Sequence, residues 1–274
     1  DGFGEGIDAF YGSVRIVIQD NLVIGNKAVG IYMDAAQDVL VQRNIVLGST
    51  TNTRGSGISM NNEKYQYSSS GGSLPDSFIN KNIRIYNNLV AFTARGVGVV
   101  AEAEFSNYTN VKVANNIFVD NNKQLTIYTD KFSGSGNIFA NNIFLSISSG
   151  TADFEGVSVS SGLKMASNSW TSTPKSFLAS GSDVVGGAVL AKMAGWRNIS
   201  GVGQVNASDF QPVSSSRTNG KATLIAETGI TTDFYGNPVP NSGANIGAFQ
   251  GGDSGSLPEA GTVPPSPPTN LRVE

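Results

Sequence analysis

The 274-residue sequence contains neither cysteine nor histidine. Without cysteine, a disulfide framework and thiolate metal sites are excluded. Without histidine, the chain lacks the commonest general base and metal ligand, and it cannot form a Ser-His-Asp triad. Any catalysis or metal binding must therefore use carboxylate, amide, hydroxyl, amine or guanidinium groups.

Charged residues are also scarce, at 14% of the chain, and the formal net charge is −3. This weak negative charge predicts no general affinity for nucleic acid. No apolar run approaches the roughly 20 residues that a membrane-spanning helix needs, so we expect no membrane span. Glycine is frequent, with 33 residues, which suits a chain of strands and tight turns.

The sequence instead repeats one phrase, which is clearest in residues 27–44, KAVGIYMDAAQDVLVQRN, followed by IVLGS. Each copy has three short apolar strands separated by polar turns. One apolar residue marks each first strand: Ile7, Ile31, Ile58, Val99 and Ile127. One Asn marks each turn between the second and third strands: Asn21, Asn44, Asn88, Asn116, Asn142 and Asn168. A fixed period with three strands per unit and no helical signal predicts a solenoid of parallel strands.

The Gly-Ile or Gly-Val strand opening and the Asn-Asn turn, as in NNLV and NNIF, resemble those of pectate-lyase-like right-handed parallel β-helix proteins. The resemblance covers residues 1–170. It implies an all-β, right-handed parallel β-helix, an architecture that serves lyases, hydrolases, epimerases and non-enzymatic adhesins. Asn suits this turn because it tolerates left-handed backbone and its amide can bond the equivalent amide one rung away.

Composition divides the chain into four segments. Residues 1–172 are the coils, with a long insertion at 62–80, and 173–250 form a final coil and C-terminal cap in which 182–196 could be a short helix. Residues 251–268 are a Gly/Ser/Pro linker, and 269–274 resemble the start of a fibronectin type III domain. This arrangement favours a secreted or cell-surface bacterial protein. Because the repeat is already under way at Asp1, we expect earlier coils or another chain to cap the open solenoid end.

Alternation along the first strands predicts a column of outward oxygen-bearing side chains. Its members are Asp34, Asn61, Glu102 and Asp130. Like charges on neighbouring strands repel each other. A Ca²⁺ ion would relieve that repulsion, because oxygen ligands are what this ion takes. Alternatively, these side chains turn into solvent where the strands end.

A second predicted column lies four residues before each marker and is basic: Lys27, Arg54, Arg95 and Lys123. It could hold a polyanion such as a uronate polymer, or its charges could be paired locally and solvated. Four tyrosines and a serine are further candidates for contacting sugar: Tyr32, Ser59, Tyr65, Tyr67 and Tyr128. Outward glycines, Gly30, Gly57 and Gly98, could form a flat floor for a ligand or serve a tight turn entering the strand.

These features meet on one face beside the insertion and favour a carbohydrate-active protein that binds an extended, acidic polysaccharide. The preferred reaction is β-elimination of a uronate polymer, with Ca²⁺ on Asp34, Asn61 and Glu102 neutralising the sugar carboxylate. Lys64, Arg95 or Tyr128 would remove the proton, and the resemblance likewise implies Ca²⁺ used with Lys or Arg. One alternative is a glycoside hydrolase that uses Asp34 and Glu102 as its carboxyl pair. The other is a non-catalytic β-helical adhesin or surface structural protein.

Overall fold

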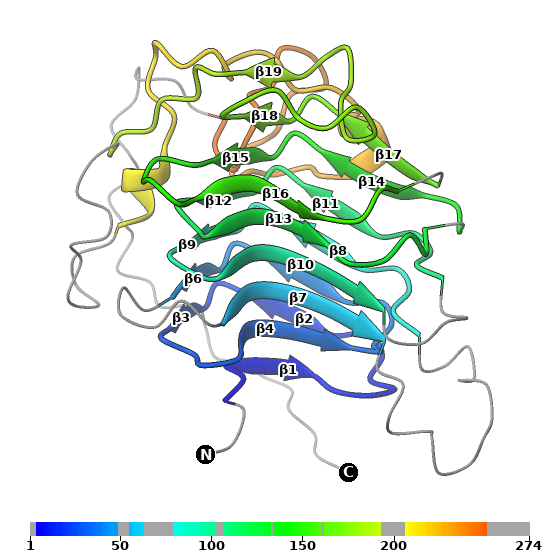
Figure 1. The fold of residues 1–274 in the computed structure, drawn as a ribbon. Helices are drawn as coiled ribbons and strands as arrows, with labels where there is room; N and C mark the ends of the chain where they lie inside the picture. Colours follow the sequence, from blue (N-terminus) through cyan, green and yellow to red (C-terminus); the bar gives the residue numbers. More distant parts are fainter. Residues whose placement is uncertain are drawn as a thin grey trace.

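The computed structural model describes residues 4–48, 55–62, 79–101, 107–132, 134–159, 162–192 and 206–250. These residues form a parallel β-solenoid in which three sheets run along the stack (Figure 1). Each turn of the chain contributes one strand to each sheet, and we call such a set of three strands a rung. The predicted all-β solenoid is therefore confirmed.

The strands of the three sheets follow one another in sequence order along the solenoid. Sheet 1 contains β1 (Ile7–Ala9), β4 (Val29–Asp34), β7 (Ser56–Asn62), β10 (Arg95–Ala101), β13 (Lys123–Ile127) and β16 (Ala152–Gly156). Sheet 2 contains β2 (Val17–Gln19), β5 (Leu40–Gln42), β8 (Arg84–Tyr86), β11 (Lys112–Ala114), β14 (Asn137–Ala140) and β17 (Leu163–Ala166). Sheet 3 contains β3 (Leu22–Ile24), β6 (Ile45–Leu47), β9 (Leu89–Ala91), β12 (Ile117–Val119), β15 (Ile143–Leu145), β18 (Ser169–Trp170) and β19 (Val184–Val185).

The register of sheet 1 corrects part of the predicted repeat alignment. Ile31 pairs with Ile58 as expected, but Ile58 pairs with Val97 rather than Val99. The next step is the expected one, since Val99 pairs with Ile127 and Val97 with Leu125. All these side chains are fully buried, so the residues predicted to point inward do so. Only the pairing of β7 with β10 differs, by two residues, from the predicted register. A shift of two residues keeps every side chain on its own face of a strand, which is why the apolar pattern could not detect it.

The predicted asparagine column is confirmed and is continuous from the first rung to the sixth. In each step the backbone N–H and side-chain amide of one Asn donate to Oδ1 of the next. The amide-to-amide distances run from 2.9 Å between Asn21 and Asn44 to 3.0 Å between Asn142 and Asn168. The left-handed backbone, however, belongs to the residue before each Asn, such as Asn87 before Asn88 and Asn115 before Asn116.

In the segment predicted as a final coil and cap, 173–250, one more strand joins sheet 3. β19 pairs with β18, and Asp183 just before it accepts a hydrogen bond from the Asn168 backbone N–H at 2.9 Å. The described part of the segment expected to form a helix, 182–192, contains this strand and no helix. Val184 packs against sheet 3, and that packing overrides the local helical propensity.

The C-terminal segment 206–250 lies along the outside of sheets 2 and 3. It includes a 3-10 helix, η5 (Ala207–Phe210), and one turn of α-helix, α1 (Ile225–Thr228). Phe210, Ile246 and Phe249 form an apolar cluster with Leu89 and Ile117, which point outward from sheet 3. No helix in the described part of the chain is long and apolar enough to cross a membrane.

Candidate functional site

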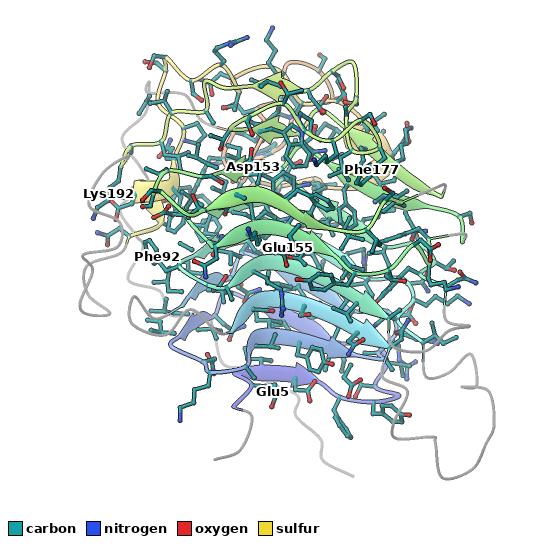
Figure 2. All side chains as sticks on the ribbon, viewed as in Figure 1. Glu5, Phe92, Asp153, Glu155, Phe177 and Lys192 are labelled. Carbon is teal, nitrogen blue, oxygen red and sulfur yellow. The ribbon has the colours of Figure 1, made fainter. Side chains whose placement is uncertain are left out.

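The strongest candidate site lies on the outer face of sheet 1, over β10, β13 and β16. Arg95 opens β10 and pairs in register with Lys123, which opens β13. Tyr128 directly follows β13, and Glu155 lies in β16. Figure 2 shows Glu155 over the strands of sheet 1 at the front of the solenoid. We call Arg95, Lys123, Tyr128 and Glu155 the Tyr128 cluster.

The four side chains of the Tyr128 cluster contact one another. The Arg95 guanidinium carbon lies 5.2 Å from the centroid of the Tyr128 ring, within cation–π range. The Tyr128 hydroxyl donates to Glu155 Oε1, and Lys123 Nζ lies 3.6 Å from Glu155 Oε2. These contacts with charged neighbours hold the Tyr128 side chain in place. Tyr128 is nevertheless 36% exposed, so part of it remains open to solvent.

These contacts set the protonation states of two groups in opposite directions. The hydrogen bond from Tyr128 lowers the pKa of the Glu155 carboxyl, and Lys123 and Arg95 add to that effect. Burial, followed by the hydrogen bond to Glu155, raises the pKa of the Tyr128 phenol. At neutral pH the cluster therefore presents a carboxylate, a neutral phenol and two cations. A raised pKa makes Tyr128 a poor general base, which works against one of its predicted roles.

The predicted basic column divides in two. Lys27 is exposed and lies two residues before Val29, which pairs with Ser56. Ser56 in turn pairs with Arg95, and Arg95 pairs with Lys123. Lys27 is therefore two residues out of register with these two cations. The displacement is the two-residue register shift seen in the core. Among the described residues of this column, only Arg95 and Lys123 lie opposite each other on neighbouring strands.

The predicted acidic column is divided by the same shift. Asp34 pairs with Asn61, as expected, but Asn61 pairs with Val100 and not with Glu102. Asp34 and Asn61 are buried, at 2% and 7% exposure, whereas Asp130 is exposed. Among the described residues no group of three or more acidic side chains could hold a metal ion.

Asp34 and Asn61 alone do not fit a calcium ion. They are two neighbouring oxygen donors, whereas Ca²⁺ takes 6–8 oxygen ligands. The third predicted ligand, Glu102, lies outside the described residues, so the calcium site stays a prediction. No step of the function proposed below uses a metal.

Two predicted sugar contacts are buried. Tyr32 and Ser59 pair with each other on β4 and β7 and are 8% and 6% exposed. A ligand on the outer face could not stack on the Tyr32 ring in this conformation. The other predicted contacts and the remaining catalytic candidate lie outside the described residues: Arg54, Lys64, Tyr65, Tyr67 and Glu102.

The predicted glycine column does not form one floor. A Cβ atom on Gly30 would lie 2.5 Å from Val46 Cγ1, and one on Gly57 would lie 2.3 Å from Val90 Cγ1. A side chain at either position would collide with a valine of sheet 3. These two glycines therefore allow sheet 1 to pack closely against the inward side chains of sheet 3. A Cβ on Gly98 would instead meet Ser59 Oγ at 3.2 Å.

Glu155 is the one member of the Tyr128 cluster that sequence reasoning missed. Its strand reads ADFEG and lacks the Gly-Ile or Gly-Val opening that is present in four of the five predicted first strands. The signal that could have found it is spacing, because Glu155 lies 27 residues after Tyr128, close to the interval of the Asn column.

No protein-family model matches this chain, and no curated protein sequence matches it either.

Proposed function

We propose that this protein binds an extended acidic polysaccharide on the outer face of sheet 1, with Arg95, Lys123 and Tyr128 in contact with the sugar. The observation that carries the proposal is the pair of cations on adjacent rungs beside a half-exposed tyrosine ring. Neighbouring rungs lie about 4.8 Å apart, so the two cations can reach neighbouring groups of one polyanion. The ring offers an apolar surface to a sugar face.

Glu155 gives this site a means of selection. It is paired with Lys123 and bonded to Tyr128, so a ligand carboxylate must compete with it for both groups. A neutral sugar has no charge with which to displace Glu155 from Lys123. We therefore expect polyuronates to bind more tightly than uncharged glucans. A secreted or cell-surface location is part of the same proposal, because such polymers lie outside the cell.

β-Elimination is a second candidate function, favoured by the same two cations. Arg95 or Lys123 next to a uronate carboxylate would make the neighbouring C–H proton more acidic. The reaction also needs a base, and the raised pKa of Tyr128 disfavours that phenol. Binding alone is therefore the better supported function. Hydrolysis by Asp34 and Glu102 has less support, because the Asp34 carboxyl is buried.

The test of binding is calorimetric titration of polygalacturonate and an uncharged glucan into the wild-type chain. Arg95→Gln with Lys123→Gln should weaken polyuronate binding by at least about tenfold, which corresponds to 1.4 kcal/mol. Lys164→Gln is the matched control, because Lys164 is an exposed, ion-paired lysine on sheet 2. Added salt should weaken the wild-type interaction.

Equal affinities for the double variant and the Lys164→Gln control would refute the proposed site. The same mixtures also discriminate among reactions. Unsaturated ends seen by ultraviolet absorbance together with new reducing ends indicate a lyase, and reducing ends alone indicate a hydrolase. Binding with neither product supports a non-catalytic binding protein or adhesin.

A further inference from the structure

A second row of asparagines runs beside the asparagine column, in the turn between sheets 2 and 3. On the third, fourth and fifth rungs the residue before the column is itself an asparagine: Asn87, Asn115 and Asn141. Their backbone is left-handed, with φ of 53°, 57° and 58°. All three side chains are buried, at 2%, 0% and 0% exposure. We call them the left-handed asparagines.

The first and last of the left-handed asparagines bind the C-terminal segment 206–250. Asn87 Nδ2 donates to Thr232 O at 2.8 Å. Asn141 Nδ2 donates to Thr223 O at 2.7 Å, and the Thr223 N–H donates to Asn141 Oδ1 at 2.9 Å. The segment therefore satisfies both polar atoms of the Asn141 amide but only the nitrogen of the Asn87 amide.

Asn115 lies between these two and lacks such contacts. Neither its Oδ1 nor its Nδ2 has a hydrogen-bond partner within the described part of the chain, and Asn87 Oδ1 has none there either. Ala114, the preceding residue, packs with Ile225 and Ile230 of the C-terminal segment, so the surroundings are closed and apolar. Buried polar atoms in folded proteins are almost always hydrogen-bonded, which makes three such atoms on neighbouring rungs a sign of a bound polar molecule.

The turn between sheets 1 and 2 shows that neighbouring left-handed asparagines can also bond directly. Asn82 and Asn110 have φ of 56° and 52° and occupy the third and fourth rungs. There Asn110 Nδ2 donates to Asn82 Oδ1 at 3.0 Å, and Asn82 Nδ2 donates to Asp38 Oδ1 at 2.7 Å. Asn87 and Asn115 have the same backbone and the same spacing, but the Asn87 amide is engaged by Thr232 O and the direct bond is not made.

We propose that one water molecule is bound between Asn87 and Asn115, where it donates to both Oδ1 atoms and accepts from Asn115 Nδ2. About three hydrogen bonds is the usual number for a buried water. Neighbouring rungs lie about 4.8 Å apart, a separation that suits one bridging water. A metal cation fits poorly, because only two of the three atoms are oxygens and the amide N–H group would repel it. The water thus joins the fourth rung to the buried contact that the third rung makes with the segment.

The direct test is on the wild-type chain. A high-resolution crystal structure should show a water about 2.7–3.2 Å from all three atoms. In solution, the Asn115 side-chain NH₂ protons should show cross-relaxation with water, with opposite signs in NOESY and ROESY spectra, as a long-lived bound water gives. The Asn110 NH₂ group is the internal control, because its amide bonds Asn82 Oδ1 directly. A direct bond between Asn115 and Asn87, an ion at this position or a site without ordered density overturns the proposal.

A pair of variants tests which side chain holds the water. Asn115→Leu removes two of the three partners and keeps a side chain of similar size. Leucine is compatible with this backbone, since Leu224 has a φ of 54°. Magnetic relaxation dispersion should count one long-lived water fewer than in the wild type. Asn110→Leu, the same substitution at a left-handed residue with a direct amide bond, should leave that count unchanged. An equal count in Asn115→Leu and the wild type also overturns the proposal, and the wild-type measurements decide it alone if the variant does not fold.

Discussion

At the scale of single residues, the Tyr128 cluster shows how a few contacts can set charge on an exposed sheet face. The hydrogen bond from the Tyr128 hydroxyl lowers the pKa of the Glu155 carboxyl more than either cation does. Tyr128→Phe removes that donor while keeping the ring over which Arg95 lies. The pKa of Glu155 should therefore rise toward the ordinary value of about 4.3, as followed by NMR titration of its side-chain carboxyl.

The direction of the linked stability change follows from this shift. A lowered carboxyl pKa stabilises the folded chain above the ordinary pKa, and this contribution is lost as the pH falls through the lower, folded value. Glu155 is exposed, so the contribution is small in water. Tyr235→Phe, an equally exposed tyrosine far from the cluster in sequence, is the control. An unchanged Glu155 midpoint in Tyr128→Phe would contradict the assigned hydrogen bond.

At the scale of strands, the glycines at the start of the sheet 1 strands are sites of close packing. A Cβ on Gly57 would lie 2.3 Å from Val90 Cγ1 and 2.8 Å from Gly96 O. Gly57→Ala should therefore destabilise the chain by about 1–3 kcal/mol, measured by chemical denaturation. Gly98→Ala should cost less, because its nearest neighbour is the movable Ser59 hydroxyl at 3.2 Å.

Adding Val90→Ala to Gly57→Ala gives a second check on the same contact. The valine methyl is one of the two close neighbours, so the two substitutions should be coupled rather than additive. Equal stabilities of Gly57→Ala and Gly98→Ala would show that the strand entrance has room for a side chain. In that case the glycines would serve another purpose, such as the ligand floor that the sequence left open.

The strands also show what the sequence could and could not predict. The period of three strands per turn and the Asn column depend on local patterns, and both are present in the structure. The pairing of Ile58 with Val97 depends on which residues of two neighbouring strands lie opposite each other, and alternation alone allows a shift of two. Because of that ambiguity, the prediction set Asn61 opposite Glu102, whereas Asn61 pairs with Val100. The Tyr128 cluster could be predicted only in part, because Glu155 lies in a strand without the repeat phrase.

At the scale of the whole molecule, the C-terminal segment 206–250 connects rungs that would otherwise contact only their neighbours. In simple solenoids each repeat interacts with the next, so unfolding can begin locally. Here Tyr86 on the third rung donates to Thr228 O at 2.5 Å, and Asn141 on the fifth exchanges hydrogen bonds with Thr223. Lys164 on the sixth pairs with Glu227 at 2.6 Å. With Lys112 on the fourth rung, which donates to Glu227 O at 2.8 Å, the segment contacts every rung from the third to the sixth.

The apolar outer face of sheet 3 depends on the same segment, and this dependence can be tested at Ile246. Its side chain is fully buried in the cluster that covers Leu89 and Ile117. Ile246→Asp removes that packing and places a carboxylate among apolar groups, so it should cost at least about 2–5 kcal/mol. Ser242→Asp adds the same charge at an exposed position and should leave stability nearly unchanged.

Hydrogen exchange of single amides in Ile246→Asp distinguishes detachment of the segment from unfolding of the whole solenoid. If the segment separates from sheet 3, the Gly247 amide should lose the protection given by Asn141 O, while the Asn88, Asn116 and Asn142 amides keep theirs. Binding of an apolar dye should rise at the same time, because the outward face of sheet 3 becomes exposed. Simultaneous loss of protection at all four amides would show instead that the solenoid cannot persist without its cover. The segment would then be part of the folding unit itself, since the outward side chains of sheet 3 would have no other way to leave water.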